Sequence, residues 1–154
     1  MTLEEADSAT QEKIVSYVAA STRAEDETQF AIPTGLVVAG PSIASHGPFF
    51  VRLGQRIKSD TNSTYVVLTS GECPNLKTLL KNLIKKITSR VEDDDDDDFS
   101  RPMPSSRKGP KLLDFDLGHV QEWRKKNHVQ SIVVAIQDSE AFDTALLIDF
   151  VDLV

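Results

Sequence analysis

The chain has little cysteine and no long apolar run. Its single cysteine, Cys73, excludes a framework of internal disulfides, so the sequence predicts a reducing compartment such as the cytosol or the nucleus. No apolar stretch approaches the ~20 residues that a membrane-spanning helix needs. The first residues are acidic and do not have the basic-then-apolar pattern of a secretory signal. We therefore expect neither a membrane partner nor a disulfide-stapled fold.

A surplus of basic residues is also missing. The chain has 17 Lys and Arg against 24 Asp and Glu, a net charge of −7. Seven of the acids are consecutive, at 92–98, and the rest of the chain is neutral by the same count. A DNA-binding module that acts alone usually has an excess of Lys and Arg. The composition therefore does not favour such a module.

What is present is an alternation of helices and strands. Apolar residues at helical spacing predict five helices, at 8–22 (capped by Ser8 or Thr10), from Pro48 through Ile57, at 76–91, at 116–127 and at 142–154. Short apolar runs predict three strands, at 35–40, 65–69 and 131–137. Strands that alternate with helices pair in parallel and carry helices on both faces.

The predicted fold is a three-layer α/β domain with a parallel sheet. Residues 1–30 are expected to form an N-terminal helix and linker, and 31–154 an incomplete domain, because three strands are few for such a sheet. Within it, 92–111 is low in complexity and holds too little apolar surface to fold, so we expect a disordered acidic insertion. The simplest interpretation of that run is a solvated segment, and a contact for basic partners such as histones is an alternative.

The segment after the first expected strand stands where nucleotide-binding α/β folds place a phosphate loop. Such a loop has four residues between its glycines, followed by Lys and then Ser or Thr. Here six residues separate Gly40 from Gly47, and Pro48 stands in the place of the lysine. We interpret Gly40, Ser45 and Gly47 as a degenerate phosphate loop. Neither nucleotide hydrolysis nor a cofactor is expected.

The third expected strand resembles the one that ends in metal-binding acids in nucleotide hydrolases. Its acids, Asp138 and Glu140, are separated by Ser139, whereas an active site of this kind usually has them adjacent. We interpret the pair as a degenerate acidic strand end. Asp138 is expected to cap the helix that follows. No catalytic residue and no metal ligand is predicted.

The remaining candidates for chemistry are scattered. The three histidines, His46, His119 and His128, and the one cysteine lack the close pairing of ligands that a zinc site needs. A surface or capping role is expected for His46. Cys73 is expected to be buried rather than reactive. Trp123, at helical spacing, is expected in the core.

Two stretches of the sequence match a known family. The first runs from Ile32 to Gly47 and continues at 65–84, where Cys-Pro-Asn-Leu leads into a leucine-rich helix. The second is 132–142, with its spacing of Asp, Glu and Phe. Both resemble the N-terminal region of origin recognition complex subunit 3, in a form closest to fungal members. The resemblance covers roughly residues 8–154, with the acidic run as an insertion.

The resemblance implies an AAA+-like fold that does not hydrolyse ATP. It implies a nuclear, structural subunit of a ring-shaped assembly that binds replication origins and helps to load the replicative helicase. The partners it implies are the other subunits, chiefly subunits 2 and 5, with origin DNA bound by the assembly. Family members are several times longer, so we expect this chain to be a fragment or a truncated gene product.

Two other functions stay open. A divergent nucleotide-binding protein with an unusual loop would bind ATP or GTP with magnesium and would lose binding on changing Gly40 or Asp138. An α/β interaction module of another complex would use the acidic run at 92–98 as its working part.

Overall fold

The computed structural model describes residues 3–23, 32–88 and 116–154. These residues form two compact units. Unit 1 comprises the described residues up to Val67 together with His128–Gln137, and unit 2 comprises those of Leu68–Asn127 and Asp138–Val154. The expected boundary between residues 30 and 31 and the expected disordered insertion at 92–111 lie outside the described ranges, so both expectations stay predictions.

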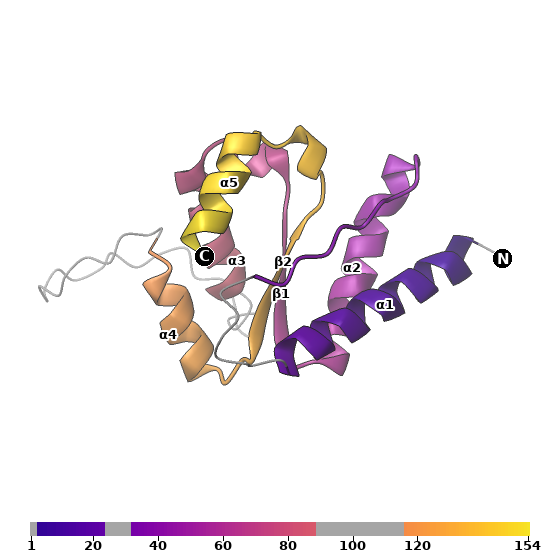
Figure 1. The fold of residues 1–154 in the computed structure, drawn as a ribbon, viewed down its shortest axis with the longest axis horizontal. Helices are drawn as coiled ribbons and strands as arrows, with labels where there is room; N and C mark the ends of the chain where they lie inside the picture. Colours follow the sequence, from indigo (N-terminus) through magenta and orange to yellow (C-terminus); the bar gives the residue numbers. More distant parts are fainter. Residues whose placement is uncertain (1–2, 24–31, 89–115) are drawn as a thin grey trace, which may run out of the picture. The chain divides into compact units, whose positions relative to one another are not determined.

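Unit 1 contains two long helices and a sheet. The helices are α1 (Leu3–Arg23) and α2 (Ile43–Asp60), and the strands are β1 (Ser63–Leu68) and β2 (Ser131–Ile136). The two helices lie side by side (Figure 1). Their contact is held by apolar faces that the spacing of the sequence predicts, so each helix is stabilised chiefly by packing rather than by its own propensity.

The core of unit 1 joins both helices to the sheet. Val15 and Val18 of α1, Leu53 and Ile57 of α2, and Tyr65 of β1 are all buried and form one cluster. Each such side chain contributes about 1.5–3 kcal/mol when it is removed from water. The predicted apolar faces of both helices are therefore confirmed.

The first helix is longer than the sequence pattern predicts. It begins at Leu3 rather than at residue 8, and the expected caps are wrong, since Ser8 and Thr10 both lie inside it. The Thr10 hydroxyl donates to the carbonyl of Ala6, one turn earlier. The Leu-Glu-Glu-Ala stretch that precedes residue 7 has high helix propensity, and acids near a helix N-terminus are favourable. These effects extend the helix beyond its buried face.

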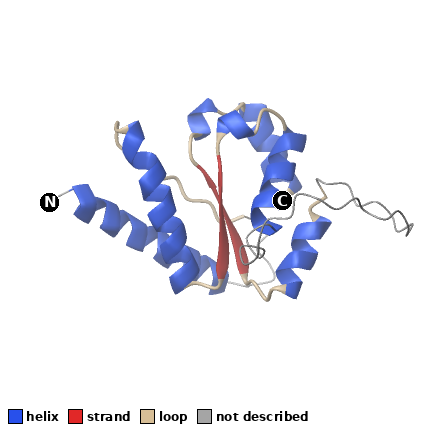
Figure 2. Ribbon diagram, turned by 180° about the vertical axis from the view of Figure 1, so that it is seen from behind, coloured by secondary structure: helices blue, strands red, loops and turns tan. Residues whose placement is uncertain are grey.

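The sheet has two parallel strands, β1 and β2, which run side by side (Figure 2). Hydroxyl groups fasten the strand starts, because the Ser63 and Ser131 oxygens are 2.7 Å apart. The Thr22 hydroxyl of α1 lies 3.2 Å from that of Ser131. The strands expected at 65–69 and 131–137 are thus confirmed, with shifts of one or two residues at their ends.

The strand expected at 35–40 is not formed in the described part of the chain. This stretch takes no part in the two-stranded sheet, and Leu36 and Val38 are 86% and 88% exposed. One side chain anchors the backbone before it, where the Tyr17 hydroxyl donates to the carbonyl of Thr34 at 3.2 Å. A strand needs a neighbour to receive its hydrogen bonds. The apolar run predicted burial, but without such a neighbour it stays exposed.

Unit 2 contains three helices and two short 3₁₀ turns. They are η1 (Ser70–Glu72), α3 (Leu76–Thr88), α4 (Gly118–Lys126), η3 (Ser139–Ala141) and α5 (Thr144–Leu153). Four residues of α3 at helical spacing form its buried face: Leu79, Leu80, Leu83 and Ile87. Asn75 caps this helix, since its Oδ1 accepts from the amide of Thr78. The three helices expected here are confirmed, with shifts of one or two residues at the ends of α4 and α5, and the end expected at residue 91 lies outside the described residues.

Candidate functional site

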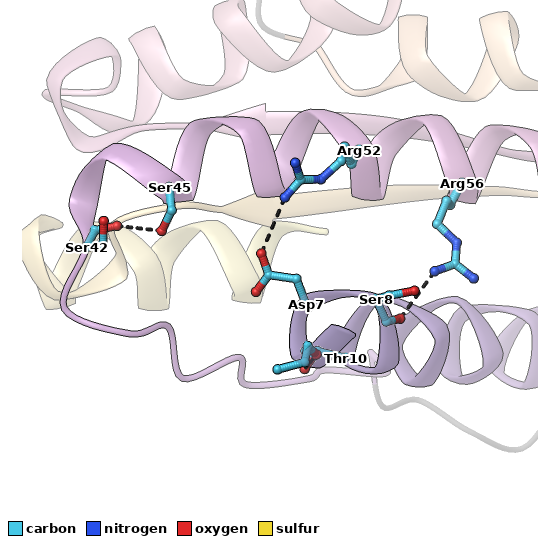
Figure 3. Close-up of polar contacts among 8 residues, drawn as sticks. Asp7, Ser8, Thr10, Ser42, Ser45, Arg52 and Arg56 are labelled. Carbon is cyan, nitrogen blue, oxygen red and sulfur yellow. Dashed lines mark hydrogen bonds and ion pairs between the residues drawn. The ribbon is translucent and has the colours of Figure 1, made fainter. Parts of the chain in front are cut away.

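The segment that we interpret from the sequence as a degenerate phosphate loop is shorter than the sequence suggests. Helix α2 begins at Ile43, five residues before the expected start at Pro48, so Ser45 and Gly47 belong to the helix. The amide and the hydroxyl of Ser45 both donate to the carbonyl of Ser42, at 3.0 and 2.7 Å (Figure 3). These bonds close the first turn early. The prediction that Pro48 opens the helix is therefore wrong.

Proline inside α2 has a cost that the helix tolerates. Pro48 cannot donate to the carbonyl of Ala44, and a proline in a helix interior is unfavourable by roughly 3 kcal/mol. Burial of Leu53 and Ile57 further along the helix offsets this term. Packing on the core therefore stabilises a helix that contains Pro48, although the sequence predicted that the helix starts there.

His46 closes the loop back on itself. Its Nε2 lies 2.8 Å from the carbonyl oxygen of Gly40, and because a carbonyl only accepts, the ring nitrogen is the donor. Pro41 and Pro48 bring no backbone N–H to the loop. A phosphate cradle consists of several backbone N–H groups that point at one anion. The described polar contacts of Ser45 and His46 instead end on carbonyl groups within the segment.

Two arginines fix α2 against α1. Arg52 Nη2 lies 3.3 Å from a carboxylate oxygen of Asp7, and Arg56 Nη1 donates to the carbonyl of Ser8 at 3.3 Å (Figure 3). The ion pair is largely exposed, so it contributes at most about 1 kcal/mol. Its effect is to set the position of α2, and with it the Gly40–Gly47 segment.

The acid after the third expected strand has a structural role in unit 2. Asp138 accepts two hydrogen bonds from Ser70, one from the backbone amide at 2.9 Å and one from the hydroxyl at 2.5 Å. Ser70 is the first residue of η1, just after β1. Both carboxylate oxygens are therefore engaged with the protein itself. Glu140 lies exposed on η3.

The expectation that Asp138 caps the following helix is wrong. Helix α5 begins at Thr144, and its cap is Asp143, whose Oδ1 accepts from the amide of Ala145 at 2.8 Å. The turn η3 and the extended Phe142 stand between Asp138 and the helix. Phe142 is buried, and this anchor delays the helix start beyond the reach of Asp138.

The turn after β1 contains a group of contacts that the sequence does not single out. Lys86 Nζ lies 2.6 Å from a carboxylate oxygen of Glu72, and this hydrogen bond holds the pKa of Glu72 below its ordinary value. Asn82 donates to the backbone carbonyl of Glu72 at 2.6 Å. The signal that points to this group is a Ser-Gly-Glu turn placed directly after a strand. It fastens η1 onto α3.

The single cysteine is buried, as predicted. Cys73 is 1% exposed, and desolvation raises the pKa of its thiol above the ordinary value. A thiol with a raised pKa is a poor nucleophile at neutral pH.

The expectation that Trp123 lies in the core is wrong, because this side chain is only half-buried and lines a groove between α3 and α4.

The predicted site residues are divided between the units. Gly40, Ser45 and Gly47 belong to unit 1, and Asp138 and Glu140 belong to unit 2. Among the described residues, no group of three or more His, Cys, Asp or Glu side chains is placed to hold a metal ion. Within the same ranges, every helix is too short or too polar to cross a membrane.

Comparison with known proteins gives a family. No curated protein and no solved structure matches the chain. A family model matches residues 1–154, which is the whole chain, and describes the N-terminus of origin recognition complex (ORC) subunit 3. The resemblance at 32–47, 65–84 and 132–142 points to the same family. The chain therefore belongs to the family of the N-terminus of origin recognition complex subunit 3.

Proposed function

We propose that this chain is a non-catalytic structural part of the origin recognition complex. In this role it supports origin DNA binding and replication initiation by holding neighbouring subunits, in the nucleus. Family membership supports a place in the complex. The chemistry of the described residues supports a role in assembly, and the AAA+-like fold remains part of the proposal.

The observation that carries the proposal is the early start of α2. Because the helix begins at Ile43, only Pro41 and Ser42 separate it from Gly40. A functional phosphate loop is longer, and it ends in a lysine that reaches the outer phosphates and a hydroxyl that binds Mg²⁺. Here Pro48 and Phe49 follow Gly47. These features favour a segment that no longer binds nucleotide.

The hydrogen bonds of Asp138 support the same interpretation. A carboxylate that holds Mg²⁺ in a nucleotide hydrolase needs an oxygen available for the metal shell. In this chain both oxygens accept from Ser70. Asp138 follows the strand and holds the turn η1 through Ser70.

The partners that we propose are the other subunits of the complex, chiefly subunits 2 and 5. Exposed apolar residues of unit 1 offer a surface for such contacts, and Leu36, Val38 and Ile43 are each more than 80% exposed. Apolar surface of this kind is more common at interfaces than on isolated proteins. We therefore assign residues 36–43 as one contact segment.

The first experiment is affinity purification of the tagged full-length protein in moderate salt, followed by mass spectrometry. Recovery of the other origin-complex subunits in similar amounts is expected. Replacing Glu92–Asp98 by Asn and Gln should leave that recovery unchanged, whereas a module that works through its acidic run would lose its partners. Failure to recover any origin-complex subunit would contradict the proposal.

A second experiment addresses nucleotide binding. Isothermal titration calorimetry with ATP and GTP in the presence of magnesium is expected to show no binding at millimolar concentration. The matched variant is Asp138→Asn, which should behave identically. Magnesium-dependent binding that this variant or Gly40→Ala abolishes would favour a divergent nucleotide-binding protein instead.

A further inference from the structure

A groove lies between α3 and α4 of unit 2, with a volume of about 630 Å³. Its floor is largely apolar and includes Ile84, Thr88 and the half-buried ring of Trp123. The Thr88 hydroxyl already donates to the carbonyl of Ile84 within α3. The volume of the groove gives room for a large apolar side chain. Its composition, an apolar floor with a few polar groups, is typical of ligand sites.

The rim of the groove is basic. Lys81 and Lys85 lie one turn apart on α3, and Lys126 comes from the last turn of α4. The two helices together have four lysines in α3 and three basic residues in α4, against the single acid Glu122. Glu122 and His119 also line the groove, so one carboxylate stands among three ammonium groups. The local charge is positive although the chain is acidic as a whole.

We propose that this groove binds an acidic peptide segment of a partner protein, with an apolar side chain next to its carboxylates. The apolar side chain enters the floor beside Trp123, and the carboxylates pair with Lys85 and Lys126. Recognition of acidic motifs by clustered basic side chains is a recurrent mode of peptide binding. The inference goes beyond the proposed assembly role, and it can be tested on this chain without any origin-complex subunit.

The same features favour a peptide over nucleic acid. Nucleic-acid affinity comes from many phosphate contacts along an extended basic track. Here three lysines surround one apolar floor, and outside the run at 92–98 the chain has equal numbers of acidic and basic residues. A long polyanion would need further basic residues beyond the groove. A short segment would meet chiefly the basic rim.

The test uses a fluorescent peptide, Glu-Asp-Asp-Asp-Asp-Asp-Asp-Phe, which copies the order of residues 92–99 and supplies both acids and an aromatic anchor. Its binding to the 154-residue chain is measured by fluorescence anisotropy at two salt concentrations. We expect binding that weakens with salt and that weakens further when the peptide's Phe is replaced by Ser. Trp123→Ala should weaken it as well, while circular dichroism confirms that the variant is folded.

Adjacent charge reversals on α4 provide the matched pair. Lys126 lines the groove and Lys125 does not. Lys126→Glu should weaken peptide binding about tenfold, since it removes one attractive charge and adds a repulsive one. Lys125→Glu makes the same change in net charge and should weaken peptide binding by less than about threefold. Equal effects of the two variants would overturn the proposal, because they would show attraction by net charge alone.

Three further outcomes would overturn it. If the peptide binds only after Glu92–Asp98 are replaced by Asn and Gln, the chain's own acidic run competes for the groove and no partner is needed. Failure of the peptide to bind even then would show that the groove is not an acidic-peptide site. Displacement of the peptide by a short DNA duplex at equal concentration would assign the groove to nucleic acid.

Discussion

At the scale of single residues, the polar groups that follow the strands make contacts within the protein. Asp138 holds Ser70 by two hydrogen bonds, and Lys86 fastens Glu72. Hydrogen bonds to a charged acceptor are stronger than those between neutral groups. Both carboxylates, those of Asp138 and Glu72, therefore serve to hold the turn η1 in place.

The bond between Asp138 and Ser70 can be weighed by substitution. Asp138→Asn keeps the shape of the side chain and leaves only one oxygen to accept, so we expect a loss of about 1–3 kcal/mol in the free energy of unfolding. Urea denaturation followed by circular dichroism measures it. The control is Glu140→Gln, an exposed neighbour, which should change stability by less than about 0.5 kcal/mol. Equal effects at the two positions would contradict the assigned role.

The buried thiol predicts a dependence of stability on pH. Burial raises the pKa of Cys73 above the ordinary 9.0, so the folded state keeps its proton when the unfolded thiol has already ionised. The contribution of the protonated thiol to the free energy of unfolding is therefore complete below pH 9.0, and it is lost as the pH rises through the pKa of Cys73 in the folded state. To isolate this contribution, the midpoints of urea unfolding of the chain and of Cys73→Ala are compared at pH 8 and above. A constant difference across that range would refute the prediction.

At the scale of elements, α2 shows how packing decides at which position a helix needs glycine. Gly54 is buried against Tyr65, and a Cβ placed on it would lie 2.5 Å from the ring. Gly47, in the same helix, has nothing within 4 Å of such a Cβ. Close packing therefore requires glycine at position 54. At position 47, no contact among the described residues requires it.

The two glycines predict effects of opposite sign. Gly54→Ala forces the Tyr65 ring to move and should destabilise unit 1 by about 1–3 kcal/mol. Gly47→Ala removes a flexible residue from a helix and should stabilise it by about 0.5–1 kcal/mol. Thermal unfolding of both variants measures the difference. Stabilisation by both substitutions would mean that Tyr65 does not pack against Gly54 as described.

At the scale of the whole chain, the exposed segment at 36–43 matters most. Its side chains are those of a buried strand, yet they face solvent. An unpaired apolar segment is a site for association, either with a correct partner or with other copies. The exposed apolar segment supports the proposed assembly role. For the same reason, we expect the chain alone to be poorly soluble.

Lysine substitutions at this segment test that reasoning. Leu36→Lys with Val38→Lys should reduce self-association of the chain, measured by static light scattering, and should leave its thermal unfolding nearly unchanged because both side chains are exposed. Gln55→Lys with Gln121→Lys adds the same charge at exposed polar positions and should have a much smaller effect. If both pairs reduce scattering equally, general charge rather than the apolar segment controls association.

The sequence by itself determined the α/β class, the helices with clear apolar faces and the two strands that pair. Apolar spacing decides these features because burial is the largest favourable term in folding. Missing residues were equally informative, since the lack of a lysine at Pro48 is visible without a structure. The family resemblance also needed only the order of residues.

Tertiary structure alone decided where each element begins and what each polar group contacts. Helix α2 starts at Ile43, ahead of the proline that predicted its start, with the first turn closed by hydrogen bonds from Ser45 to Ser42. The lack of a pairing neighbour left 35–40 outside the sheet, and Ser70, distant in sequence, took both oxygens of Asp138. The last two outcomes depend on contacts between residues far apart in the chain, which local propensity and periodicity do not encode.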